Sequence, residues 1–168
     1  NSANFSVPGS GKTWMAYAAF LELKKRKIVD KILVIGPLSA FRPWEFEYKQ
    51  IFGKPPKSYR IKSHKIDRLL AYLDENEIFL VSYKTAANYQ EYLIHALKQE
   101  KFLLICDESH YIKNPSSERT TAALEIAPYA TCRMILTGTP MPQGPEDLWG
   151  QFTFLLPRQE LLGSFAEY

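Results

Sequence analysis

The stretch Pro8-Gly9-Ser10-Gly11-Lys12-Thr13 lies near the start of the chain and decides its fold class. It follows a short apolar segment over residues 3–7 and opens a helical pattern over residues 12–26. A glycine-rich loop that ends in Lys-Thr, between a strand and a helix, is the arrangement of a Walker A phosphate-binding loop. The alternative is a glycine-rich turn that precedes Lys-Thr by chance, but strand, loop and helix all favour the first interpretation.

The chemistry of this loop predicts an ATP site. Its glycines let backbone N–H groups point at phosphate oxygens, and the helix N-terminus adds a positive partial charge. Lys12 is expected to reach the β- and γ-phosphates, and the Thr13 hydroxyl is expected to hold magnesium. The predicted cofactors are therefore ATP and Mg2+, bound by the loop residues Pro8, Gly9, Ser10, Gly11, Lys12 and Thr13.

Short apolar runs alternate with helical patterns along the rest of the chain. Buried strands are expected over residues 31–35, 78–82, 102–106 and 132–136, and residues 58–61 are a further candidate. Helices are expected over residues 43–52, 64–75, 86–100, 115–127 and 145–155. This alternation predicts a three-layer α/β sandwich, in which a mostly parallel sheet carries helices on both faces.

An acidic pair, Asp107-Glu108, follows the expected strand over residues 102–106 directly. Two adjacent carboxylates repel each other and need a cation to neutralise them, so Asp107 is expected to bind Mg2+. Glu108 is then the expected general base that orients and deprotonates the attacking water. His110 closes a D-E-x-H box and is included among the catalytic candidates. The alternative for the pair is a solvated acidic turn.

Each polar motif sits directly after an expected strand. In a parallel sheet the C-terminal ends of all strands open on one edge, where ligands bind. Five segments that lie far apart in the sequence are therefore expected to meet on one surface, namely residues 9–13, 37–39, 82–85, 107–110 and 137–140.

These motifs together carry a family resemblance. The loop, the D-E-x-H box and Leu136-Thr137-Gly138-Thr139-Pro140 resemble motifs I, II and III of superfamily-two, DEAH-box-like helicases and translocases. The stretches after Asp107 and after Pro140, and Gly36-Pro37-Leu38-Ser39 followed by Trp44-Glu45, are similar to those of Swi/Snf-type ATPases. Ser6 stands where the full loop pattern has glycine, although superfamily-two helicases commonly carry a small residue there. Ser109 and Gln143 depart from the family pattern, which usually has alanine and asparagine at these places.

The resemblance implies the N-terminal RecA-like lobe of a two-lobe motor that acts on double-stranded DNA. Residues 1–168 are expected to form this single lobe, with the second RecA-like lobe and its arginine fingers absent. By resemblance, the nucleic-acid backbone would meet Pro37, Ser39, Arg42, Ser82 and Thr85. Thr137 and Thr139 would hydrogen-bond toward Asp107 or His110 and link the nucleotide to the other sites. Ordinary loop capping is the alternative for these hydroxyls.

The composition permits this function without implying it. The chain has 168 residues, a net charge of +3 and two cysteines, Cys106 and Cys132, which are expected to be buried reduced thiols. Residues 1–7 lack the basic start and apolar core of a signal peptide, and no apolar stretch is long enough to span a bilayer. An intracellular setting with no membrane partner is expected, cytoplasmic or nucleoid in bacteria and nuclear in eukaryotes.

Two other functions stay open from the sequence. One is the lobe of another superfamily-two protein, such as an RNA or DNA helicase or a restriction-enzyme motor, which would bind ATP in the same way. The other is a nucleotide-binding interaction module that does not hydrolyse ATP. The intact Lys12, Asp107 and Glu108 argue against the second alternative.

Overall fold

A six-stranded, fully parallel sheet forms the centre of the computed structural model, which describes residues 1–7 and 9–157. The strand order is β1-β6-β5-β2-β4-β3. The strands are β1 (Ser2–Asn4), β2 (Lys31–Gly36), β3 (Ser58–Arg60), β4 (Ile78–Ser82), β5 (Phe102–Asp107) and β6 (Cys132–Leu136). The sequence therefore predicted every strand, including the candidate at residues 58–61.

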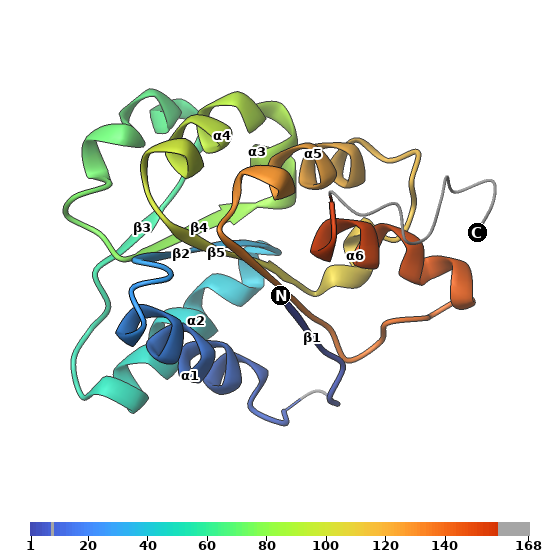
Figure 1. Cartoon of the computed structure of the whole chain (residues 1–168), viewed down its shortest axis with the longest axis horizontal. Helices are drawn as coiled ribbons and strands as arrows, with labels where there is room; N and C mark the ends of the chain where they lie inside the picture. Colours follow the sequence, from blue (N-terminus) through green and yellow to red (C-terminus); the bar gives the residue numbers. More distant parts are fainter. Residues whose placement is uncertain (8, 158–168) are drawn as a thin grey trace.

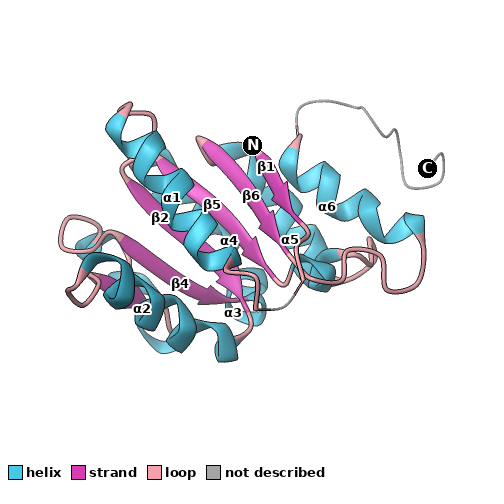
Figure 2. Ribbon diagram, turned by 90° about the horizontal axis from the view of Figure 1, so that it is seen from below, coloured by secondary structure: helices cyan, strands magenta, loops and turns pink. Residues whose placement is uncertain are grey.

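Helices cover both faces of this sheet (Figures 1 and 2). On one face lie α1 (Lys12–Lys25) and α2 (Leu38–Phe52). On the other lie α3 (Tyr83–Asn88), α4 (Gln90–Gln99), α5 (Glu118–Ile126) and α6 (Leu148–Leu155). Five 3-10 helices complete the described part: η1 (Ser63–Arg68), η2 (Leu70–Tyr72), η3 (Ser109–Ile112), η4 (Ala127–Tyr129) and η5 (Pro145–Asp147).

The sheet separates two hydrophobic cores because successive side chains of a strand point to opposite faces. In β2, Ile32 and Val34 pack with α1 and α2, whereas Leu33 and Ile35 pack in the core beneath α3 to α6. All four side chains are at most 2% exposed. Burial on both faces explains why the strands read as continuous apolar runs, and it confirms the predicted three-layer sandwich.

The first strand is shorter than predicted. It ends at Asn4, whereas the apolar pattern predicted a strand over residues 3–7. The Asn4 side chain provides the reason, since its Oδ1 accepts the Ser6 N–H at 3.0 Å. This local bond turns the backbone out of the ladder and into the phosphate loop.

Several predicted helices differ from those in the structure. The helix expected over residues 86–100 is divided at Tyr89, which has a φ of −135°, into α3 and α4, and the helix expected over residues 145–155 begins as η5 before α6. The helix expected over residues 43–52 begins at Leu38, with Pro43 inside it rather than at its start. Proline lacks one N–H, but its fixed φ is helical, and the burial of Phe41 and Trp44 on either side favours the longer helix. The helix expected over residues 64–75 is instead the pair η1 and η2, where Lys65 has a non-helical φ of −136°.

Among the described residues, no helix is long and apolar enough to cross a membrane. Both cysteines are free thiols: Cys106 is buried as predicted, and Cys132 is only half-buried. Burial raises the pKa of the Cys106 thiol well above its ordinary value.

Candidate nucleotide-binding site

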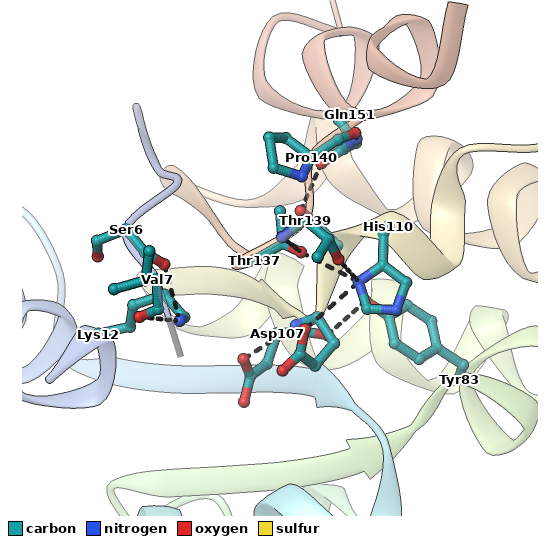
Figure 3. Close-up of polar contacts among 12 residues, drawn as sticks. Ser6, Val7, Lys12, Tyr83, Asp107, His110, Thr137, Thr139, Pro140 and Gln151 are labelled. Atoms are coloured by element: carbon teal, nitrogen blue, oxygen red, sulfur yellow. Dashed lines mark hydrogen bonds and ion pairs between the residues drawn. The ribbon is translucent and has the colours of Figure 1, made fainter. Parts of the chain in front are cut away.

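The phosphate loop has the backbone conformation that its glycines allow. Gly9 and Gly11 have φ angles of 78° and 79°, in the left-handed region that favours glycine. The Lys12 ammonium folds back and donates to the carbonyls of Ser6 at 3.0 Å and Val7 at 3.2 Å (Figure 3). Its position at the start of α1 places this charge at the mouth of the loop. Pro8 lies outside the described residues.

Ser6 stands where the full loop pattern has glycine, and the structure shows what its hydroxyl does. Ser6 Oγ donates to Asn4 Oδ1 at 2.5 Å and accepts from Ser10 Oγ at 2.8 Å. The Ser6 hydroxyl therefore links Ser10 of the loop to Asn4 at the end of β1.

Asp107 closes the other side of the site at the C-terminal end of β5. Its Oδ2 accepts from Trp44 Nε1 at 2.8 Å, and its Oδ1 accepts the Glu108 N–H at 2.9 Å. The Tyr83 hydroxyl donates to its backbone carbonyl at 2.8 Å. Burial raises the pKa of Asp107, while the hydrogen bond from Trp44 opposes that rise and the charge of Glu108 adds to it. A neighbouring cation would relieve this penalty.

His110 connects Glu108 with the two threonines of the third motif (Figure 3). Its Nδ1 lies 3.4 Å from Glu108 Oε2, 3.0 Å from Thr137 Oγ1 and 3.4 Å from Thr139 Oγ1. The prediction that both threonines bond toward Asp107 or His110 is therefore confirmed for His110. Thr137 is fully buried, so its hydroxyl is a fixed partner, whereas Thr139 is exposed.

A pocket of about 580 Å³ joins these parts. Its walls come from the phosphate loop, the end of β5 and α2 with the residue before it: Gly9, Gly11, Lys12, Thr13, Trp14, Pro37, Ser39, Ala40, Pro43, Phe46, Glu47, Gln50, Asp107 and Glu108. No group of three His, Cys, Asp or Glu residues suited to a metal occurs in the described part of the chain. Mg2+ is commonly held by one or two carboxylates together with substrate phosphates, so the donors Thr13 and Asp107 fit a metal that arrives with a nucleotide.

Comparison with known families decides what kind of domain carries this site. The family model for the SNF2-related domain matches residues 7–167. The chain belongs to the SNF2-related family. The Swi/Snf resemblance read from the motifs is confirmed.

Curated relatives of this SNF2-related domain are much longer proteins. The DNA annealing helicase and endonuclease ZRANB3 of Bos taurus is 32% identical over 139 residues, which cover 82% of this chain and 13% of that protein. The DNA repair and recombination protein RAD54B of Homo sapiens is 31% identical over 147 residues, covering 85% of this chain and 15% of that protein. The chain thus spans about a seventh of the length of these relatives.

Solved structures show the same fold. The SWI2/SNF2 ATPase core of Sulfolobus solfataricus in complex with dsDNA aligns with a TM-score of 0.78 and 30% identity. The alignment covers 99% of this chain and 33% of that one. The same core solved as the ATPase core domain aligns with a TM-score of 0.76 and 31% identity. These matches confirm the predicted RecA-like α/β fold for the SNF2-related domain.

The residues predicted to contact nucleic acid lie at the same edge of the sheet. Those at the start of α2 have exposed side chains, whereas Ser82 and Thr85 are engaged in hydrogen bonds. Pro37 precedes α2, and the exposed Ser39 lines the nucleotide pocket. Arg42 is exposed on the same helix. Ser82 and Thr85 bond to each other at 2.9 Å, and Ser82 Oγ also accepts the Thr85 N–H at 3.1 Å. The Ser82 hydroxyl therefore caps α3, as the alternative interpretation expected, and it donates to the Thr85 hydroxyl.

Sequence reasoning missed the contribution of α2 to the site. Trp44 is 0% exposed, and its indole N–H donates to Asp107. Glu47 lies three residues further on, half-buried beside Thr13 and Asp107. Burial raises the pKa of the Glu47 carboxyl, a hydrogen bond with the Thr13 side chain opposes the rise, and the charge of Asp107 adds to it. The i, i+3 spacing places both residues on one face of α2, but it gives no sign of their partners on other elements.

Proposed function

We propose that this chain is the ATP-binding lobe of a nucleic-acid-dependent ATPase that translocates on or remodels double-stranded DNA. The single observation that carries the proposal is that one pocket brings together Lys12 and Thr13 with Asp107 and Glu108. These are the parts that phosphoryl transfer to water requires: a cation for the phosphates, a hydroxyl and a carboxylate for a metal, and a base for the nucleophile.

Each residue has a separate task in this proposal. The Lys12 ammonium would exchange its carbonyl partners on Ser6 and Val7 for phosphate oxygens. The Thr13 hydroxyl and the Asp107 carboxylate would hold Mg2+, which supplies charge neutralisation for the transferred phosphoryl group. Glu108 is the general base, because its half-exposed carboxylate lines the pocket.

His110 and Thr137 would connect the nucleotide to the rest of the machine. The Glu108 carboxylate reaches His110 Nδ1, and the same nitrogen contacts Thr137 at the end of β6. A change at Glu108 is therefore transmitted through one histidine to the loop that carries Thr139. This chain of contacts supports a coupling role for motifs II and III.

Double-stranded DNA is the favoured partner because the relatives are named as DNA annealing, repair and recombination proteins, and one solved relative is a complex with dsDNA. Pro37, Ser39 and Arg42 are the proposed backbone contacts, with Ser82, Thr85 and Thr139 nearby on the same edge. Such contacts position a strand without reading its bases. We propose that a second RecA-like lobe completes the site. The whole protein would then act where DNA is found, in the nucleus or the nucleoid.

Nucleotide binding by this chain tests the proposal directly. A fluorescent ATP analogue titrated with Mg2+ should bind the wild-type chain and lose most of its affinity for Lys12→Ala, because the phosphates lose their ammonium partner. Lys25→Ala, at the other end of the same helix, is the matched control and should bind like wild type. Equal binding by wild type and Lys12→Ala would reject the site.

A further inference from the structure

The carboxylate of Glu47 is the feature of the pocket that the proposed chemistry leaves unexplained. Its Oε2 atom is buried and has no hydrogen-bond partner among the described residues. Burying a carboxylate oxygen without hydrogen-bond partners costs desolvation free energy. Because Glu47 lines the nucleotide pocket, a bound ligand could supply the missing partner.

The surroundings of Glu47 favour a hydrated divalent cation. The Thr13 side chain lines the same pocket and lies close enough to lower the pKa of the Glu47 carboxyl, and Asp107 lies close enough to repel that carboxylate electrostatically. Two carboxylates and a hydroxyl that face one space suit a cation rather than an anion. Both oxygens of Asp107 already accept a hydrogen bond, from Trp44 and from Glu108, so Glu47 carries the free oxygen.

The geometry of a hydroxyl ligand explains what Glu47 does for Thr13. A threonine hydroxyl has one proton and two lone pairs, so a lone pair can face a cation only when the proton points elsewhere. The Glu47 carboxylate, which lines the same pocket as Thr13, is the acceptor available for that proton. Its other oxygen is then available to a water molecule of the metal, because Mg2+ dehydrates reluctantly and usually keeps several waters.

We propose, building on the ATP-binding function above, that Glu47 is a positioning residue for the metal of the bound nucleotide. It acts through the Thr13 hydroxyl and through the hydration shell of the cation, without entering the reaction. Trp44, one helical turn earlier on α2, holds the other metal ligand Asp107. One face of α2 thus orients both protein ligands, and the same helix begins with the proposed DNA-contacting residues.

The test measures the affinity for Mn2+ in the presence of saturating ADP, with free Mn2+ followed by electron paramagnetic resonance. Glu47→Gln should weaken Mn2+ binding about 10–100-fold, the usual effect of removing a partner of a metal ligand. Nucleotide affinity in EDTA should stay unchanged. Glu45→Gln is the matched control: it lies on the same helix, pairs with Arg60 and Ser58, and should leave Mn2+ affinity unchanged.

A merely structural role for Glu47 would lower the urea midpoint of Glu47→Gln. The proposal predicts instead that this midpoint stays equal to or above that of wild type while the affinity for Mn2+ falls, because the variant removes an uncompensated buried charge. In a cycle with Thr13→Ala, the Glu47→Gln effect should shrink in the Thr13→Ala background, because the two residues act through one hydrogen bond. Full additivity, or wild-type Mn2+ affinity in Glu47→Gln, would overturn the inference. Failure of the wild-type chain to bind ADP would instead overturn the proposed function, and this inference with it.

Discussion

At the scale of single residues, Glu108 combines strain with chemistry. It has a left-handed backbone conformation, with φ 51° and ψ 53°, which is unfavourable for a residue with a side chain. Such strain costs about 1–3 kcal/mol and persists where the surroundings over-determine it. Here the Glu108 N–H bonds to Asp107 Oδ1 at 2.9 Å and its carbonyl accepts the Tyr111 N–H at 3.0 Å. The turn aims the carboxylate away from β5 and toward the pocket.

Replacing this carboxylate separates binding from hydrolysis. In a longer protein that includes the second lobe, Glu108→Gln keeps the shape of the side chain but removes the base, so nucleotide affinity should be retained and single-turnover ATP hydrolysis should fall about 10²-fold or more. Glu125→Gln, an exposed position on α5, is the control and should hydrolyse ATP at the wild-type rate. Unchanged turnover in Glu108→Gln would mean that another group activates the water, and a longer wild-type protein without any hydrolysis would favour the non-hydrolysing module.

At the scale of elements, α6 is joined to the acidic motif by buried polar contacts. Ser109, where the family usually has alanine, is fully buried and donates to Gln151 Oε1 at 2.7 Å. Gln151 on α6 is also fully buried, and its Nε2 donates to the carbonyls of Pro140 at 2.7 Å and Asp147 at 2.9 Å. The departure from the family pattern therefore has a partner on a distant element. These bonds link motif II, the loop after motif III and α6.

Removing the Ser109 hydroxyl should weaken this link. Ser109→Ala leaves Gln151 Oε1 buried without its donor, which is expected to destabilise the chain by about 1–3 kcal/mol in urea unfolding. Ser116→Ala, the same change at an exposed site, should alter stability by less than about 0.5 kcal/mol. If both variants unfolded at the same urea concentration, the Ser109–Gln151 bond would contribute nothing measurable.

At the scale of the whole molecule, the site is open on one side. The described arginines near the acidic motif are engaged elsewhere: the Arg119 guanidinium lies over the Tyr111 ring at 5.5 Å. Arg133 donates to the carbonyls of Ala127 at 2.8 Å and Ala130 at 2.9 Å. Neither guanidinium is placed to meet the γ-phosphate from above the pocket. These two guanidiniums therefore do not neutralise charge that develops in the pocket, which agrees with the proposed contribution of a second lobe.

Hydrolysis by this chain alone should accordingly be slow, even with DNA present. In related phosphoryl-transfer enzymes an arginine finger contributes about 10³–10⁵ in rate, and by family resemblance that arginine belongs to a second lobe. The measurement compares the DNA-stimulated ATPase rates of this chain and of a longer protein that includes the second lobe, both at the same salt concentration. An equal rate for the chain alone would reject the two-lobe proposal.

The sequence by itself determined the sheet, the phosphate loop and the acidic strand end, because these depend on local patterns. Apolar runs of strand length and the Gly-Ser-Gly-Lys-Thr spacing need no knowledge of distant neighbours. The start of α2 was misjudged because helix length there depends on the burial of Phe41 and Trp44, a long-range effect that overrides the preference for proline at a helix start. The roles of Trp44, Glu47 and Gln151 appeared only in the tertiary structure, since each acts on a residue from another element. A polar side chain in a helix pattern carries no local sign of the partner that folding brings to it.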